Sequence, residues 1–320
     1  MTRPRVVIAA PLYRAGDHLD DALGSLLAQT YRDFALVLVD DASGDGTAER
    51  ARALAGGDER VEVHENPERL GVLANTNRAC ALATRRAPGA DYFALSSDHD
   101  VWDPLWLERM VAALDANPAA VLAYPLSSRV DAAGREIAGP WRFDTAGVAD
   151  QRARLRLTLR RMVAGAMVYG LFRASALAEV GDFYAPVLYP DRLLLAELAL
   201  AGEFVQVPEL LWRRRVLGPA SRRRQRRALW LDDAPLHSYA PSSIVHAALV
   251  ARRHGRRLAL VDHLPASLAL EVRELGQRLA YAPVRVIAPP VARSRLGRAV
   301  ASGRIPAPKR VSAAVKRLSE

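Results

Sequence analysis

Short apolar runs alternate with helical periodicity along the first 125 residues of the chain. The runs are rich in β-branched residues and have the length of buried strands; they lie at residues 6–10, 34–40, 61–64, 91–97 and 120–124. Between them apolar residues recur every three or four positions, as in Leu19, Leu23 and Leu26. This βαβ order predicts an α/β fold with a mostly parallel sheet flanked by helices.

The pattern changes after residue 125. A hairpin is expected around Gly134, a basic helix at 150–161, an apolar segment at 162–172, and a helix at 193–201 that Gly202 ends. Residues 204–207 and 210–213 are expected to form a pair of strands. Amphipathic stretches follow at 243–253 and 266–281, before an end rich in Pro and Arg that we expect to be weakly ordered. The pattern predicts one domain over residues 1–215 and a basic helical extension over 216–320.

The composition is that of a folded globular protein. Of the 320 residues, 50% are hydrophobic and 25% are charged, which excludes disorder of the whole chain. The single Cys80 cannot form an intramolecular disulfide, and no Cys/His cluster has the spacing of a structural zinc site. Because no uncharged stretch is long and apolar enough to span a bilayer and the N-terminus lacks the pattern of a signal peptide, we expect a cytoplasmic protein.

Charge is distributed unevenly along the chain. Residues 1–150 hold 15 Lys and Arg against 23 Asp and Glu, a net charge of −8, whereas residues 151–320 hold 30 against 12, a net charge of +18. The acidic part suits a cation, and the basic part suits phosphates or an anionic membrane surface. A solvated Arg-rich face is the alternative explanation of the basic part.

Polar residues follow three of the predicted strands at the point where each strand ends. In an open parallel sheet these ends line the ligand crevice, so the residues are expected to converge: Pro11, Tyr13, Asp40, Asp41, Asp98, His99 and Asp100. A carboxylate such as Asp41 can accept hydrogen bonds from a base and a sugar hydroxyl. Asp45 lies in the same turn, where we expect it only to shape the turn and cap the next helix.

The segment SSDHDVW at residues 96–102 carries two carboxylates two positions apart, with an imidazole between them. Mg²⁺ and Mn²⁺ prefer oxygen ligands, and Mg²⁺ often takes one or two carboxylates together with substrate phosphates. The motif therefore indicates a divalent cation bridging a diphosphate. A surface turn without a ligand is the alternative.

Four segments together resemble glycosyltransferase family 2, in order and in spacing: PLY at 11–13, LAQTYRDFALVLVDDASGDGT at 27–47, NPERLGVLANTNRA at 66–79, and SSDHDVW. The resemblance covers residues 5 to about 215. It implies a GT-A fold, with a nucleotide-sugar half over about 1–125 and an acceptor half over about 126–215. It also implies a nucleotide-diphosphate sugar donor, a divalent cation (Mn²⁺ or Mg²⁺) and inversion at the anomeric carbon.

The resemblance also implies roles for individual residues. Pro11 and Tyr13 would line the base and ribose, Asp41 would hold the base, and Gly71 and Asn77 match the family's third nucleotide-side segment. Asp98 would lie on the nucleotide side as well.

The acidic metal motif departs from the common family pattern. Many relatives read Leu-Asp-x-Asp-Asp, whereas Leu95 is followed here by two serines and then by Asp98, His99 and Asp100. Asp98 and Asp100 are expected to hold the cation, and His99 could replace a carboxylate as a ligand.

Further along the chain, Asp191 follows Pro190 where the family usually has Glu-Asp at the start of a helix beside the acceptor. The resemblance makes Asp191 the candidate general base. A helix cap is the alternative that its position alone would favour.

These assignments predict transfer of one sugar to an acceptor hydroxyl, because the Gln-x-x-Arg-Trp motif and membrane helices of processive relatives are not found. UDP is the default nucleotide, and the acceptor is expected to be a saccharide or a lipid-linked molecule in cell-surface polysaccharide or glycolipid synthesis. Two alternatives stay open. One is a nucleotidyltransferase, and the other is a nucleotide-sugar-binding protein whose altered metal motif no longer supports turnover.

The run SRRRQRRALW at residues 221–230 places five arginines close to Trp230. Such a cluster suits anionic lipid headgroups or a lipid-linked pyrophosphate, and would place the protein at the inner face of the plasma membrane. A solvated face explains it equally well. No nucleic-acid-binding module accompanies the run, so nucleic acid is not expected as a partner.

Overall fold

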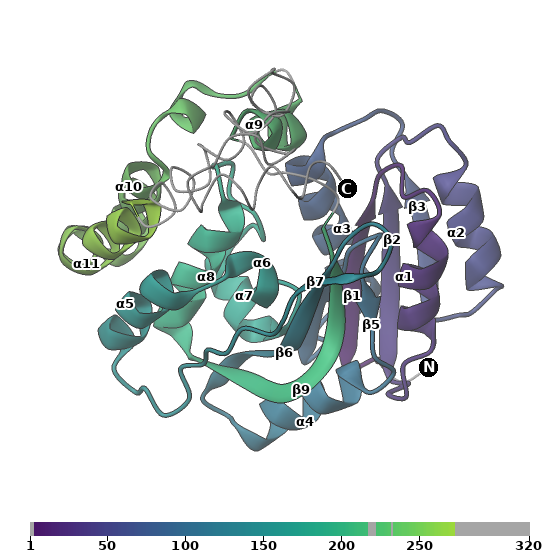
Figure 1. Ribbon diagram of the computed structural model, residues 1–320, viewed down its shortest axis with the longest axis horizontal. Helices are drawn as coiled ribbons and strands as arrows, with labels where there is room; N and C mark the ends of the chain where they lie inside the picture. Colours follow the sequence, from purple (N-terminus) through teal and green to yellow (C-terminus); the bar gives the residue numbers. More distant parts are fainter. Residues whose placement is uncertain (1–2, 217–221, 232, 273–320) are drawn as a thin grey trace, which may run out of the picture. The chain divides into compact units, whose positions relative to one another are not determined.

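The computed structural model describes residues 3–216, 222–231 and 233–272 (Figure 1). By its contacts the chain divides into two compact units, Met1–Ala266 and Ser267–Glu320. The first unit contains the sheet and the helices described below. The predicted weakly ordered end and most of the amphipathic stretch at 266–281 lie outside the described residues. The predicted boundary near residue 215 stays a prediction.

A nine-stranded mixed sheet forms the centre of the first unit. Its strands are β1 (Val6–Leu12), β2 (Phe34–Asp40), β3 (Val61–Glu65), β4 (Tyr92–Leu95), β5 (Val101–Trp102), β6 (Ala120–Val130), β7 (Glu136–Ala138), β8 (Leu171–Arg173) and β9 (Glu203–Arg215). The order is β3-β2-β1-β4-β8-β6-β9-β5, and β7 pairs with β6. The strands β3, β2, β1 and β4 run parallel, as do β6 and β9, while β8 is antiparallel to both β4 and β6. The predicted α/β fold is confirmed.

Helices cover both faces of this sheet. They are α1 (His18–Leu27), α2 (Thr47–Ala55), α3 (Val72–Arg86), α4 (Trp106–Ala116), α5 (Gln151–Arg161), α6 (Ala164–Met167), α7 (Ala174–Val180) and α8 (Pro190–Ala201). The core of one face joins Leu23 of α1 and Met110 of α4 to Ile8 of β1. The alternate residue Val7 lies with Cys80 of α3 in the lining of a cavity on the other face. Burial on both faces explains why β1 and β2 are continuous apolar runs.

The strand pair expected over residues 204–213 is wrong, because these residues form the single strand β9. This strand pairs in parallel with β6 along almost its whole length. Pro125 pairs with Val207 and Leu126 with Leu210, so the two residues between them bulge out of the ladder. The bulge contains Pro208 and Glu209, the two residues between the predicted strands. The hairpin around Gly134 is present between β6 and β7.

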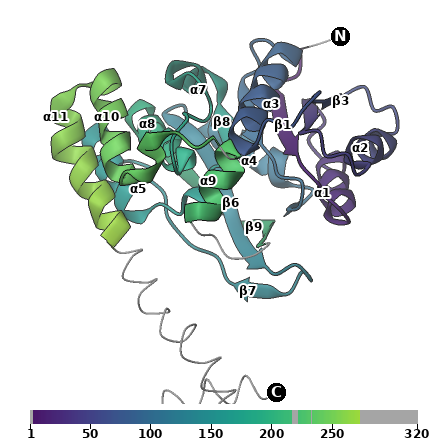
Figure 2. The same ribbon diagram turned by 90° about the horizontal axis from the view of Figure 1, so that it is seen from above.

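Three further helices follow the sheet: α9 (Arg222–Trp230), α10 (Ser242–His254) and α11 (Arg256–Leu258), the last continuing into a π-helical turn at Ala259–His263. A 3-10 turn lies at Leu236–Tyr239. Val250 and Ala259 share a buried cluster with Val187, just before α8, and with Leu193 of α8, so α10 and the helix that begins with α11 pack against this part of the fold (Figure 2). Within the described ranges, no helix has both the length and the hydropathy needed to cross a bilayer.

Candidate active site

The polar residues at the carboxyl ends of the strands lie together, as predicted. The backbone N–H of Tyr13, just after β1, donates to Asp98 Oδ2 after β4 at 3.1 Å. Arg14 N–H donates to Ser43 Oγ at 2.9 Å, and Ser43 in turn donates to Asp40 at the end of β2. Three strand ends are therefore joined by direct hydrogen bonds.

Asp41 is buried and organises the loop before α3. Its carboxylate accepts hydrogen bonds from Leu70 N–H at 2.7 Å, Gly71 N–H at 2.9 Å and Asn66 Nδ2 at 3.0 Å. Because two carboxylate oxygens offer about four acceptor sites, this carboxylate can accept one further donor. Asp45 accepts from the N–H and the hydroxyl of Thr47, which matches its expected role in the turn.

Gly71 lies at the start of α3 with φ +86°, and a Cβ there would be 3.2 Å from the carbonyl oxygen of Leu229 in α9. Asn77, in contrast, is turned away from the strand ends. Its amide donates to the carbonyl oxygen of Tyr184 and accepts from the N–H of Tyr184, both at 2.8 Å.

Sequence reasoning missed Asn75, which is buried one helical turn into α3. Its Nδ2 donates to Val39 O at 3.0 Å in β2, and its Oδ1 accepts from Asn66 at 2.9 Å. Asn75 and Asn77 both occur in the NPERLGVLANTNRA segment. Their positions in the sequence do not reveal which of them faces the sheet.

The ring of Tyr13 carries a stacked cation. The guanidinium carbon of Arg69 lies 4.1 Å from the ring centroid, and that of Arg14 lies 5.4 Å away. Pro11, the last residue but one of β1, is half-buried. Leu12, next to Tyr13, accepts the N–H of the buried Asp41, so an aromatic ring and a carboxylate are available on neighbouring segments, and these are the groups that stack on and hydrogen-bond a nucleobase.

His99 lies between the two carboxylates of the acidic motif. Its Nδ1 is 2.6 Å from Asp98 Oδ1, and its Nε2 is 3.9 Å from Asp100 Oδ1. Burial alone would lower the pKa of His99, but the hydrogen bond to Asp98 and the charges of both carboxylates raise it. Burial also raises the pKa of Asp100, whose carboxylate accepts the N–H of Arg215 at 2.7 Å. The end of β9 is thus hydrogen-bonded to the acidic motif.

Asp191 is the second residue of α8. Burial raises the pKa of its carboxyl group, and the positive charges of Arg192 and Arg214 counteract part of that effect. Arg214 also lowers the pKa of Asp100, so its charge acts on both carboxylates. Within the part of the chain that the structure describes, Arg214 forms no hydrogen bond or ion pair. Its Nη2 would be 2.5 Å from a Cβ at Gly165, which shows how closely the guanidinium lies against α6.

The donor set fits a divalent cation that is shared with a substrate. Among the described residues no three His, Cys, Asp or Glu side chains form a metal-binding group. A cation held by one or two carboxylates and by substrate phosphates needs no such group. Asp98 keeps 16% of its side chain exposed, whereas Asp100 keeps 2%, so Asp98 is the more accessible oxygen donor.

The family model described as glycosyl transferase family 2 matches residues 7–176, more than half of the chain. The chain belongs to glycosyltransferase family 2. The match includes the strand ends that carry Tyr13, Asp41, Asp98 and Asp100, but it stops before Asp191.

Curated relatives match this family 2 protein over its first part. TuaG of *Bacillus subtilis*, whose name refers to teichuronic acid biosynthesis, is 30% identical over 109 residues, which are 34% of this chain and 41% of TuaG. Glycosyltransferase GlyG of *Streptococcus pneumoniae* is 24% identical over 117 residues, 37% of each chain. The matched segment therefore spans about two fifths of the length of these relatives.

Solved structures share the fold over nearly the whole chain. TarS of *S. aureus*, residues 1–349 in complex with UDP-GlcNAc, superposes with a TM-score of 0.60 at 14% identity, covering 97% of this chain and 83% of that one. The mannosyltransferase PcManGT of *Pyrobaculum calidifontis*, in complex with GDP-Man and Mn²⁺, has a TM-score of 0.52 at 18% identity, covering 100% and 87%. These likenesses show the GT-A fold.

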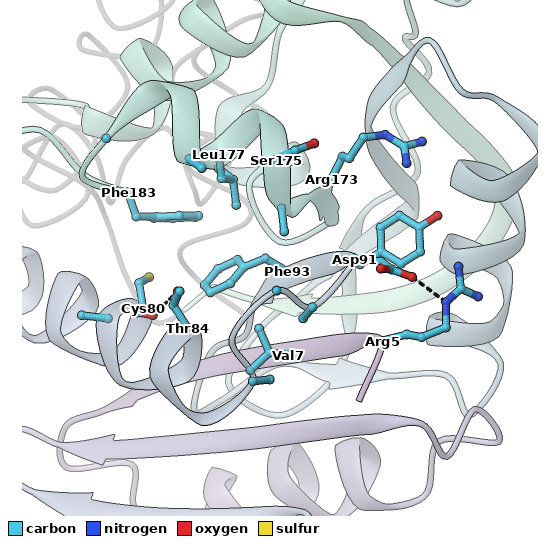
Figure 3. A pocket seen from close by; sticks show the side chains of 18 of the residues that line it. Arg5, Val7, Cys80, Thr84, Asp91, Phe93, Arg173, Ser175, Leu177 and Phe183 are labelled. Atoms are coloured by element: carbon cyan, nitrogen blue, oxygen red, sulfur yellow. Dashed lines mark hydrogen bonds and ion pairs between the residues drawn. The ribbon is translucent and has the colours of Figure 1, made fainter. Parts of the chain in front are cut away.

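A separate cavity of about 850 Å³ lies between α3, β4 and α7 (Figure 3). Its lining is largely apolar and includes Val7, Cys80, Phe93, Leu177 and Phe183. At one end Arg5 is already paired with Asp91 at 2.7 Å. Asn77 is the only predicted site residue in this lining, so the cavity is distinct from the strand-end site.

Proposed function

We propose that this family 2 protein is a metal-dependent inverting glycosyltransferase that moves one sugar from a nucleotide-diphosphate sugar to an acceptor hydroxyl. The observation that carries the proposal is the junction of three strand ends, in which Tyr13 N–H donates to Asp98 and the preceding Leu12 accepts the N–H of the buried Asp41. The junction offers candidate partners for a nucleotide and for a cation. Asp191 is the candidate general base for the acceptor hydroxyl.

On the donor side, the base stacks on Tyr13 beside Pro11, and Asp41 accepts a hydrogen bond from it. Gly71 keeps the loop close to Asp41 through its own N–H. Asn77 supports this segment indirectly, since its amide is bonded to Tyr184. UDP is the default nucleotide.

Asp98 and Asp100 would hold the Mn²⁺ or Mg²⁺ ion, and His99 is the alternative ligand. When bound, the ion neutralises negative charge on the diphosphate. Asp98 is assigned to the nucleotide side, because its Oδ2 accepts the N–H of Tyr13 while its Oδ1 contacts His99.

Asp191 acts as the general base. It accepts the proton of the acceptor hydroxyl while that oxygen forms a bond to the anomeric carbon. The bond between this carbon and the diphosphate oxygen breaks, and the nucleoside diphosphate leaves with the electron pair. Attack opposite the leaving group inverts the anomeric centre.

The acceptor is proposed to be a saccharide or a lipid-linked molecule in cell-surface polysaccharide or glycolipid synthesis. The name of TuaG, which refers to teichuronic acid, supports this class. We further propose that the protein works peripherally at the inner face of the plasma membrane, on an anionic lipid surface.

The first experiment is thermal unfolding of the protein with UDP, GDP or dTDP, each with Mn²⁺ and with EDTA. A ligand that binds only the folded state raises the melting temperature. We expect one nucleotide to do so in a manner that depends on Mn²⁺, and Asp98→Asn to remove the metal-dependent part. If no nucleotide shifts the melting temperature, the donor site is assigned wrongly.

The second experiment measures turnover of the matching nucleotide sugar by Asp191→Asn. Loss of a general base is expected to lower the turnover rate by about a hundredfold or more. Nucleotide binding should be unchanged, because Asp191 is placed on the acceptor side. Nucleotide binding by the unaltered protein without turnover of any UDP-, GDP- or dTDP-sugar would favour a binding protein instead.

A further inference from the structure

The helix that begins with α11 exposes apolar side chains to solvent. Leu260 and Val261 are 61% and 56% exposed, although Ala259 before them and His263 after them are buried. Pro265 is exposed one turn later. In the sequence, the same helical spacing continues with Leu264, Leu268 and Val272. Such a face has no reason to be apolar unless something covers it.

Unpaired cations lie one turn before these side chains. Arg256 precedes Leu260 by four residues, and Arg257 precedes Val261 by four, so each pair lies on one side of the helix. Arg256, Arg257 and the nearby Arg252 are exposed and form no ion pair or hydrogen bond with any described residue. The only acidic residue between 240 and 266 is Asp262, which is buried between two arginines of α5.

The basic helix α9 offers no comparable apolar face. Leu229 is buried, and Trp230 packs in the same cluster with Leu73 and Leu188. The apolar side chains expected near the basic run are therefore turned into the protein. The run at 221–230 contributes charge at most, and the exposed face of the α11 helix carries both charge and apolar contact.

This surface is tied directly to the candidate acceptor side. Arg253 of α10 pairs with Glu197 of α8 at 2.7 Å. The ring Nε2 of His246 lies 2.9 Å from the carbonyl oxygen of Leu188, three residues before Asp191. A contact made by α10 and α11 is therefore held in a defined position relative to the start of α8.

We infer that Arg256, Arg257, Leu260 and Val261 form a surface that docks on anionic lipid bilayers, with the arginines at the headgroups and the aliphatic side chains inserted below them. The inference deepens the proposed function, because it rests on an acceptor that is presented at a membrane. A second copy of the chain fits this surface poorly. A two-fold contact would bring Arg256 and Arg257 of the two copies together, and the only acidic residue between 240 and 266 is the buried Asp262.

The test is co-sedimentation of the full chain with vesicles, without nucleotide. One set contains only phosphatidylcholine, and in the other about a third of the lipid is phosphatidylglycerol. We expect binding to the anionic vesicles that weakens with added salt. Leu260→Ser with Val261→Ser, and separately Arg256→Gln with Arg257→Gln, should each weaken binding by about tenfold.

Matched controls remove similar groups elsewhere. Ile137→Ser with Leu210→Ser takes away two side chains that are 52% and 49% exposed, and Arg85→Gln with Arg142→Gln takes away two exposed charges. Both control proteins should bind like the unaltered chain. Equal binding to both kinds of vesicle, no binding, or equal loss in the controls overturns the inference.

Sedimentation velocity of the same proteins tests a second copy as the occupant. A dimer that only the Leu260→Ser and Val261→Ser protein loses would assign the surface to self-association and overturn the lipid inference. The melting-temperature shift with nucleotide is measured on every variant. Vesicle binding without a melting-temperature shift by any nucleotide would support the lipid surface and reject the donor site. A melting-temperature shift by nucleotide without vesicle binding would reject only the lipid surface.

Discussion

Strained backbone conformations stand beside three of the candidate site residues. Arg14, Ala42 and Tyr189 all have positive φ values, between +49° and +58°, which non-glycine residues rarely adopt. They adjoin Tyr13, Asp41 and the first turn of α8. Such strain persists only where the surrounding structure enforces it. Hydrogen bonds such as that from Arg14 N–H to Ser43 do so here.

Arg214 is the residue whose role is most directly testable. It lowers the pKa of Asp191, which burial raises. A general base works only when deprotonated, so the rate is lost as the pH falls through the raised pKa. Arg214→Gln removes the positive charge and should raise that pKa further, moving the acidic limb of the kcat/KM profile to higher pH.

The matched control is Arg213→Gln, which removes the same charge from an exposed neighbour in β9. Its pH profile should coincide with that of the unaltered protein. If Arg214→Gln lowers the rate equally at every pH, Arg214 does not act through the ionisation of Asp191.

Gly71 is needed for its conformation and for its lack of a side chain. With φ +86° and ψ 163°, it occupies a region that only glycine enters readily. Gly71→Ala should lower the free energy of unfolding by about 1–3 kcal/mol. It should also weaken nucleotide binding, because Gly71 N–H holds Asp41. Urea denaturation and the nucleotide-induced melting shift measure the two effects.

Gly24→Ala is the control for Gly71→Ala. A Cβ at this position in α1 meets no atom within 4 Å, and its φ is not positive. Replacing a helical glycine by alanine should raise stability by about 0.5–1 kcal/mol. Equal stability changes in the two variants would contradict the conformational argument.

At the scale of elements, one buried carboxylate joins the π-helical turn to α5. Asp262 is fully buried, and its oxygens accept from Arg152 at 2.6 Å and from Arg156 at 2.5 Å. The π-helical turn brings Asp262 and the buried His263 to the inner side while Leu260 and Val261 stay exposed. The same turn thus orients the exposed apolar face.

Asp262→Asn should lower the free energy of unfolding by about 1–3 kcal/mol, because it weakens two hydrogen bonds between charged groups while Arg152 and Arg156 keep more than a third of their side chains exposed. Chemical denaturation measures the loss. Asp20→Asn is the matched control, since the pair of Asp20 with Arg50 has both side chains more than two fifths exposed. Its cost should stay below about 1 kcal/mol. If Asp262→Asn lowers the free energy of unfolding by no more than Asp20→Asn does, the cluster of Asp262 with Arg152 and Arg156 does not stabilise the C-terminal helices.

Elements with strong local patterns were predictable, and elements defined by distant partners were not. The apolar run of β2 ends at Asp40 in both the sequence pattern and the structure. The apolar pattern of β9 predicts two short strands, at 204–207 and 210–213, because two more polar residues, Pro208 and Glu209, lie between them. The long parallel pairing with β6 overrides that local preference, and no local sequence signal reports such a pairing.

At the scale of the molecule, the helices after residue 215 complete the core around the start of α8. Val187, Leu188 and Leu193 are buried against Leu229, Val250 and Ala259, which all come from this later part. Helices α9 and α10 of the predicted basic extension therefore pack against the segment around α8 through apolar side chains. The ion pair of Glu197 with Arg253 adds a polar contact.

A chain ending at residue 215 should be less stable than the full chain by on the order of 5 kcal/mol, because several large apolar side chains become exposed. Thermal unfolding of both proteins measures the difference. A chain ending at residue 266 keeps these contacts and serves as the control. If the shorter chain melts at the same temperature as the control, the boundary near residue 215 separates independent domains.

The sequence by itself determined the α/β class, the four neighbouring parallel strands β1 to β4, and the residues that follow them. These follow from local periodicity and from the rule that parallel strands present their ends at one edge. Only the tertiary structure decided that Asn75 faces the sheet while Asn77 holds Tyr184, that Arg214 acts on both Asp100 and Asp191, and that Trp230 packs inward. Each of these depends on which distant segment a side chain meets, and that is set by packing of the whole chain.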